Sequence, residues 1–244
     1  MNYEREELEL KYEITSQLRN LVPERGLKNT QAFEEKMLWA LQDLKPKFHI
    51  AFGNFKLPES TAIVNLGTWF NCSGRTEGFC DICVECYDKC KEVMFKKIIK
   101  ARLEQELFFR HYPADVIADK IIREILAQNA RDKKPTVDKI RFSEVGEMRN
   151  QADFEKVIEI SNIVYDKLNI ESYIYTHNKY LDFNVARPHL TVNGSGFMVD
   201  NEYRVINKGE TVDEKHYDCL CDCKNGCDIC TRKLGIIIVE ELRL

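Results

Sequence analysis

The chain of 244 residues is long enough to bury a substantial core, and its 44% hydrophobic and 31% charged residues are typical of a soluble globular protein. Its formal net charge of −4 excludes the strongly basic field of many nucleic-acid-binding proteins, so we do not expect nucleic acid as a partner. No apolar run approaches the ~20 residues that span a bilayer, and the first residues are charged, unlike a signal peptide. We therefore expect a cytoplasmic protein without membrane contact.

Residues 1–47 predict an N-terminal addition of two helices. Apolar residues recur at mainly helical spacing over residues 4–20, and Pro23 follows as a helix stop. A second helix is predicted to begin at a cap near Asn29 or Thr30, with an apolar face for packing. These residues show no pattern that indicates chemistry.

From residue 48 the pattern changes to alternating strands and helices. Helices are predicted at 86–110, 113–130 and 153–169. Strands are predicted at 60–67, 138–148, 171–180, 189–199, 202–207 and 234–242. Alternating strands and helices indicate an α/β core over residues 48–218, either a partial (β/α) barrel or an open, mainly parallel sheet. Five or six strands with about three crossover helices are too few for an eight-fold barrel.

The ten cysteines are the strongest functional signal. Disulfides are rare in a reducing compartment, so clustered cysteines there indicate metal binding. All ten are candidate metal ligands, and they fall into two groups: Cys72, Cys80, Cys83, Cys86 and Cys90 in the loop 72–90, and Cys219, Cys221, Cys223, Cys227 and Cys230 in a C-terminal segment 219–244 that also holds the last strand.

The loop 72–90 fits an iron–sulfur cluster, most simply 4Fe–4S. Thiolates two residues apart converge on one centre without extensive backbone folding, as iron–sulfur clusters require. Zinc is the alternative, because four cysteines at such spacings also form a tetrahedral site. The surplus of thiols and the position of the loop after a strand favour iron–sulfur.

The second group raises a different question. Cys223, Cys227 and Cys230 have the spacing of the cluster loop of radical S-adenosylmethionine enzymes, but that loop belongs after the first strand of a barrel. Here the chain has almost ended. We interpret this stretch as a second cluster site, or as a source of distal ligands for the first.

Several short motifs in a fixed order carry a resemblance to a known family. They are "FGNFKL", the cysteine loop ending Cys86-Tyr87, "RFSEVGEM", "YTH", "TVNGSG" and the late cysteines. Together they resemble the phage gene product 88 family, which is related to the radical S-adenosylmethionine fold. The resemblance implies a radical-SAM-like core, a 4Fe–4S cluster, S-adenosylmethionine as a further cofactor, and the cytoplasm of a phage host as location. Where the family has Asp and Arg, this chain has Glu147 and His177.

A candidate cofactor pocket follows from the strand ends. In parallel α/β folds, functional groups lie beyond the carboxyl ends of the strands. The polar or glycine residues expected there are Glu144, Gly146, Glu147, His177, Asn193 and Ser195. The resemblance places Gly146 and Glu147 where radical enzymes bind the amino group of S-adenosylmethionine.

These observations lead to two functional hypotheses. The first is an iron–sulfur protein with redox or radical chemistry: three cysteine ligands would leave one iron open for S-adenosylmethionine, whereas four would saturate it, and either version needs an electron donor. The second is a zinc-stabilised, non-catalytic module that binds nucleic acid or a host protein.

Overall fold

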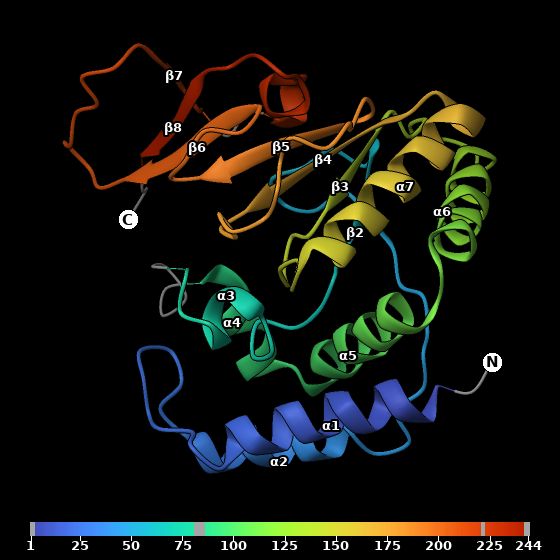
Figure 1. The fold of residues 1–244 in the computed structure, drawn as a ribbon, viewed down its shortest axis with the longest axis vertical. Coiled ribbons are helices and arrows are strands. Elements are labelled where there is room, and N and C mark those ends of the chain that lie inside the picture. The colour runs from blue at the N-terminus through green and yellow to red at the C-terminus, as the bar shows by residue number, and fades with distance from the viewer. Residues whose placement is uncertain (1–2, 81–85, 221–222, 242–244) are drawn as a thin grey trace. The chain divides into compact units, whose positions relative to one another are not determined.

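A computed structural model describes residues 3–80, 86–220 and 223–241 (Figure 1). The chain divides into two compact units, each discontinuous in sequence. Unit 1 comprises Met1–His49, Asn65–Pro113 and Val145–Arg149, and unit 2 comprises Ile50–Val64, Ala114–Glu144 and Asn150–Leu244. The domain boundaries expected from the sequence stay a prediction.

Unit 1 is helical. Its helices are α1 (Glu4–Leu18), α2 (Thr30–Ala40), α3 (Ser73–Thr76), α4 (Tyr87–Met94) and α5 (Lys96–His111). The predicted cap of α2 is confirmed, because the side chain of Asn29 accepts a hydrogen bond from the backbone N–H of Ala32 at 2.9 Å. Apolar residues from α1, α2 and α5 form one buried cluster, which includes Leu10, Met37 and Leu103 at 0% exposure. The two predicted N-terminal helices therefore exist and pack onto α5.

The prediction of one continuous helix over residues 86–110 is wrong. The backbone is extended at Phe95, with φ −124° and ψ 102°, and this break separates α4 from α5. Glu92 and Arg102, on the two sides of the break, are joined by an ion pair of 2.7 Å between Oε1 and Nη1. Ten residues along an unbroken helix would place them ~15 Å apart, so the pair requires the chain to turn.

Unit 2 contains a sheet of eight described strands in the order β1-β2-β3-β4-β5-β6-β8-β7. The strands are β1 (Ala51–Phe52), β2 (Thr61–Val64), β3 (Lys139–Phe142), β4 (Glu171–Thr176), β5 (Leu190–Ser195), β6 (Asn201–Ile206), β7 (His216–Asp218) and β8 (Ile237–Glu241). Every neighbouring pair is parallel except β1 and β2. The expected α/β class and open, mainly parallel sheet are thus confirmed.

The two faces of this sheet differ in chemistry. Val64, Phe142, Ile174 and Val192 are paired in register across β2 to β5 and are all buried. The helices α6 (Ala114–Asn129) and α7 (Gln151–Leu168) lie side by side, and α7 packs on β4 and β5 (Figure 1). Side chains alternate along a strand, so the intervening residues form a second face.

That second face is polar and aromatic. Arg141 on β3 is in register with Tyr173 on β4 and, beyond it, Thr191 on β5. Tyr175 is likewise in register with Asn193. Continuing across β6, this face carries Asn201 and Tyr203. The 3₁₀ turn η3 (Ile229–Thr231), from the cysteine-rich segment, contacts β4 and β5.

Some elements differ from the predicted pattern. The short strands β1 and β7 were not predicted, and no helix connects β4 to β5 or β5 to β6. The return from β5 to β6 depends on glycine: Gly196 has φ 79°, and a Cβ on Gly194 would lie 2.2 Å from the carbonyl oxygen of Phe197. The "TVNGSG" motif therefore belongs to a short, tight connection between two parallel strands.

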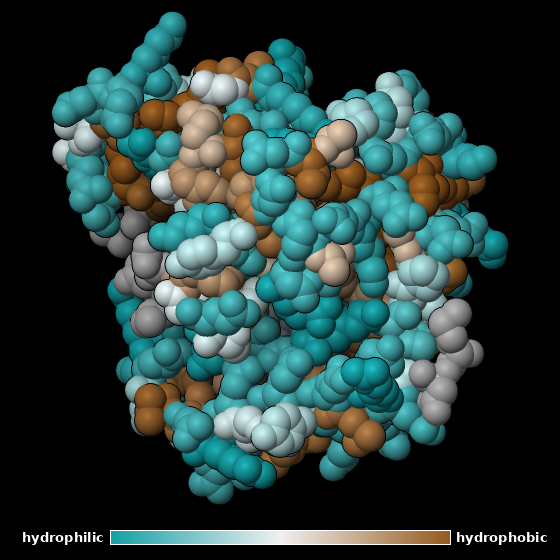
Figure 2. Space-filling model, viewed as in Figure 1, coloured by the Kyte–Doolittle hydropathy of each residue, from teal (hydrophilic) through white to brown (hydrophobic). Residues whose placement is uncertain are grey.

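In the view of Figure 2 hydrophobic residues are mostly separated by hydrophilic ones, and exposed examples on unit 1 include Leu8, Tyr12 and Leu38. Among the described residues, no helix combines the length and the apolar character that crossing a membrane requires.

Candidate thiolate sites

The two cysteine groups belong to different compact units. Cys72, Cys80, Cys86 and Cys90 are in unit 1, and Cys219, Cys223, Cys227 and Cys230 are in unit 2. The remaining candidates, Cys83 and Cys221, lie outside the described residues. No disulfide joins any two of the eight described cysteines.

In unit 1, a buried carboxylate fixes the turn that leads to Cys72. Glu92, at 0% exposure, accepts hydrogen bonds from the backbone N–H groups of Trp69 at 2.7 Å and Phe70 at 3.3 Å. Burial raises the pKa of Glu92, and the charge of Arg102 opposes that shift. The ion pair and the two backbone bonds together hold the turn against α4 and α5.

Cys72 and Cys80 lie on either side of Gly74. The backbone carbonyl of Cys72 accepts from Arg75 and Thr76, which begins α3, and the backbone N–H of Cys80 donates to the Gly74 carbonyl at 3.0 Å. A Cβ on Gly74 would lie 3.0 Å from the Cys80 Cβ and 3.6 Å from the Cys72 Sγ. Glycine at this position therefore lets the two cysteine side chains approach one another.

The other described cysteines of the loop are near α4. Cys86 is the N-cap residue of α4 and packs against the apolar cluster of unit 1. Cys90, within α4, is exposed. The structure thus brings Cys72 and Cys80 together, with Cys86 partly buried at the start of the next helix.

Gly146 and Glu147 lie next to this cysteine loop. Gly146 has φ 82°, and a Cβ there would lie 2.4 Å from the backbone nitrogen of Gly67, so only glycine allows this approach. Glu147 is 9% exposed, and its Oε1 accepts from the Met148 N–H at 2.9 Å. Burial raises the pKa of the Cys72 thiol, and the negative charge of Glu147 raises it further.

In unit 2, polar side chains of the second face hold the cysteine-rich segment by its backbone. Asn193 Nδ2 donates to the Cys230 carbonyl at 2.9 Å, Thr191 Oγ1 donates to the Thr231 carbonyl at 3.0 Å, and Asn201 Nδ2 donates to the Arg232 carbonyl at 2.7 Å. We call these three side chains the backbone clasp. Asn193 is itself fully buried, and its amide takes part in this clasp.

The other described thiols of the segment influence Cys230 electrostatically. Burial raises the pKa of Cys230 to about 12, and negative charge on Cys219, Cys223 and Cys227 also raises it. A hydrogen bond from the Tyr175 hydroxyl acts in the opposite direction. At its start the segment is joined to β8, where the Cys219 N–H donates to the Val239 carbonyl at 2.6 Å.

The donor chemistry of both groups is compatible with a thiolate-bound metal. Within the described ranges, no three Cys, His, Asp or Glu side chains are already arranged to hold a metal ion. Four thiols that influence one another electrostatically around Cys230, with no disulfide between them, are nevertheless the ligand type that iron–sulfur clusters and structural zinc use.

The remaining predicted pocket residues are in unit 2. The Glu144 carboxylate accepts a hydrogen bond from Asn54 Nδ2 at 2.8 Å. His177 directly follows β4, and Ser195 ends β5, in register with Tyr203 of β6. The predicted set is therefore distributed over both units, with Gly146 and Glu147 in unit 1.

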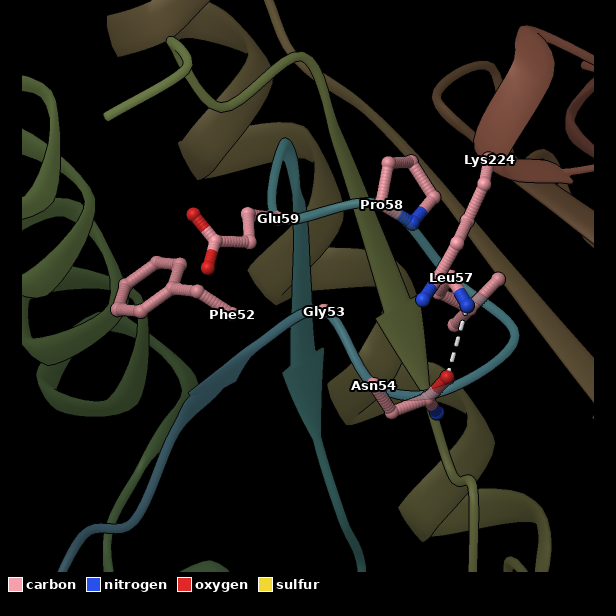
Figure 3. A pocket seen from close by; sticks show the side chains of 7 residues that line it. All are labelled: Phe52, Gly53, Asn54, Leu57, Pro58, Glu59 and Lys224. Carbon is pink, nitrogen blue, oxygen red and sulfur yellow. Dashed lines mark hydrogen bonds between the residues drawn. The ribbon is translucent and has the colours of Figure 1, made fainter. Parts of the chain in front are cut away.

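A pocket of about 410 Å³ includes Lys224, a residue of the second cysteine-rich stretch, in its lining (Figure 3). Its apolar lining residues are Phe52 of β1 and Leu57 and Pro58 of the connection between β1 and β2, and Lys224 lines it from the segment between Cys223 and Cys227. This pocket is not predicted from the sequence, because its two sides are far apart along the chain.

The polar and aromatic residues of the second face are not predicted from the sequence either. Arg141, Tyr173, Tyr175 and Asn201 share that face because of how the strands pair. The available signal was the alternation in "ESYIYT", which marks Tyr173 and Tyr175 as one face of a strand. Comparison with models of protein families, with curated proteins and with solved structures gives no match.

Proposed function

We propose that the chain is an iron–sulfur protein with a radical-SAM-like core and a thiolate centre in each unit. The observation that carries this proposal is the arrangement after the first two parallel strands. Cys72 and Cys80 lie together in the loop that follows β2, and Glu147, which follows β3, is close enough for its charge to affect the Cys72 thiol.

The strand order supports the same proposal. The parallel strands β2, β3, β4, β5 and β6 are neighbours in chain order, as they are in a partial (β/α) barrel. Radical S-adenosylmethionine enzymes carry their cluster loop after the first strand of such a barrel and a glycine-glutamate segment after the second. The resemblance to the phage gene product 88 family assigns these roles to the loop 72–90 and to Gly146 and Glu147.

Each proposed centre has its own ligands. Cys72, Cys80 and Cys86, with their loop neighbours, would hold the first, and Cys219, Cys223, Cys227 and Cys230 would hold the second. When bound, a reduced 4Fe–4S cluster supplies one electron at a time, either to a partner protein or to S-adenosylmethionine at an open iron. The protein's own contribution is to orient the thiols and, through Glu147, to offer a carboxylate to a cationic amino group.

The test is anaerobic reconstitution of the full chain, followed by electron paramagnetic resonance of the reduced protein with and without S-adenosylmethionine. The proposal expects reducible clusters and a change in one signal on addition of S-adenosylmethionine. Glu147→Gln should keep its clusters and weaken that change. A colourless protein that contains zinc would instead support the zinc-stabilised binding module, and clusters unaffected by S-adenosylmethionine would restrict the function to electron transfer.

A further inference from the structure

The sulfur of Cys230 has a polar partner of its own, in addition to the backbone clasp that binds its carbonyl group. The Tyr175 hydroxyl donates a hydrogen bond to its sulfur. Tyr175 is on β4 and is in register with Asn193 on β5, which binds the Cys230 carbonyl at 2.9 Å. Two neighbouring strands therefore fix both the backbone and the sulfur of the same cysteine.

A cation lies over the ring of Tyr175. The Arg141 guanidinium lies 5.0 Å from the centre of the Tyr175 ring. Its Nε is buried and has no hydrogen-bond partner among the described residues, so the nearby aromatic ring is a major part of its environment. On the other side, the Tyr203 ring meets Tyr175 edge-on at 5.0 Å, and its hydroxyl is bonded to Glu240 instead of to a sulfur.

Tyr175 connects a cation to the sulfur of Cys230. The Tyr175 hydroxyl acts on Cys230 directly, and the Arg141 guanidinium acts on Tyr175. Cys72, in contrast, has the carboxylate of Glu147 beside it. A hydrogen-bond donor therefore acts on Cys230, whereas a carboxylate acts on Cys72.

We propose that Tyr175 and Arg141 are positioning residues that raise the reduction potential of the metal centre held by Cys230. This inference rests on the proposed function. Reduction adds one negative charge to an iron–sulfur centre, and hydrogen bonds to its sulfurs and nearby cations stabilise that charge. Loss of one hydrogen bond to a charged sulfur should change the reduced-to-oxidised ratio about tenfold, which for one electron is a shift of ~59 mV.

The experiment is a redox titration of the reconstituted full chain, followed by electron paramagnetic resonance, with iron and sulfide counted in every sample. The signal of the second centre is assigned as the one that Cys230→Ser removes. Tyr175→Phe and Arg141→Gln should each lower its midpoint potential and leave the iron content unchanged. Tyr203→Phe is the matched control, because it deletes a hydroxyl from the adjacent ring that does not contact sulfur.

Arg141→Lys separates charge from packing: it retains the cation and should keep the midpoint nearer to that of the wild type than Arg141→Gln does. Equal midpoints in wild type, Tyr175→Phe and Arg141→Gln, with iron and sulfide present, would overturn this inference and leave the proposed function standing. Equal shifts in Tyr175→Phe and Tyr203→Phe would also overturn it. Absence of iron and sulfide from the wild type would overturn both.

Discussion

Asn193 on β5 donates a hydrogen bond from Nδ2 to the backbone carbonyl of Cys230, at 2.9 Å, inside a fully buried environment. The same amide nitrogen lies 3.3 Å from the Ile174 carbonyl, and its Oδ1 accepts from Asn201 at 2.9 Å. One side chain thus connects two central strands, a third strand and the cysteine-rich segment.

Asn193→Ala should therefore destabilise unit 2. The substitution removes the side-chain hydrogen bonds that Asn193 makes to the Ile174 and Cys230 carbonyls and one of the two that Asn201 Nδ2 donates, which should lower the free energy of unfolding by roughly 2–3 kcal/mol in urea denaturation. Asn184→Ala, at an exposed site bonded locally to Asp182, is the control and should change it by less than about 0.5 kcal/mol. Equal stabilities for the two variants would remove the structural role assigned to Asn193.

The buried pair of Glu92 and Arg102 should be necessary for the cysteine loop of unit 1. Glu92→Gln leaves the Arg102 charge buried at 2.7 Å from a neutral group, which should cost about 3–5 kcal/mol in guanidinium unfolding. The double variant Glu92→Gln, Arg102→Met removes both charges and should recover part of that loss.

The matched control for this pair is on the surface. Asp119→Asn breaks the ion pair with Arg123, whose side chains are 53% and 70% exposed, and should change stability by less than about 1 kcal/mol. A similarly small effect of Glu92→Gln would mean that the break at Phe95 does not depend on the buried pair.

Glu13 should contribute a pH-dependent part of the stability of unit 1. Burial alone would raise its pKa, but the hydrogen bonds and charge of Arg110 more than compensate, so the folded-state pKa lies below the ordinary value of 4.5. The contribution is therefore fully present above pH 4.5 and is lost as the pH falls through the lower, folded-state pKa.

Unfolding of wild type and Glu13→Gln, measured from pH 7 to acid, checks this sign. The wild type should be the more stable at neutral pH, and the difference should shrink as the pH falls below 4.5. Glu9→Gln, in an exposed pair with Arg5, should show little difference at any pH. A difference that grows toward acid would contradict the assigned direction.

The two thiolate centres should be separable by substitution. Cys230→Ser should remove the metal of the second centre while the first retains its own, and Cys72→Ser should do the reverse, because each removes one ligand from a different unit. The measurement is the metal content of each purified variant relative to wild type. Complete loss of metal from both variants would indicate one shared centre.

Much of the fold was predictable because it depends on local patterns. The capping residue Asn29, the apolar spacing of α6 and α7, and the alternation in "ESYIYT" and "LTVNGS" each determine their element over a few residues. The break at Phe95 was not predictable, because it depends on the ion pair between residues on either side of it, and the strands β1 and β7 are too short to show a pattern.

In the candidate site, too, some features can be predicted from the sequence and others cannot. The cysteines are visible in sequence because their clustering is local. The Tyr175 and Arg141 environment of Cys230 depends on the register of β3 and β4 and on a segment that returns to them from the end of the chain. The position of Asn193 at a strand end predicts a cofactor residue, and that role stays a prediction; its hydrogen bond to the Cys230 carbonyl could not be predicted, because the two residues are far apart along the chain.

The iron and acid-labile sulfide content of the chain, purified without air, tests the central claim most directly. Two occupied 4Fe–4S clusters would give about eight iron and about eight sulfide per chain and a brown protein, and one cluster would give half of each. A colourless protein with zinc, and without iron or sulfide, would contradict the account.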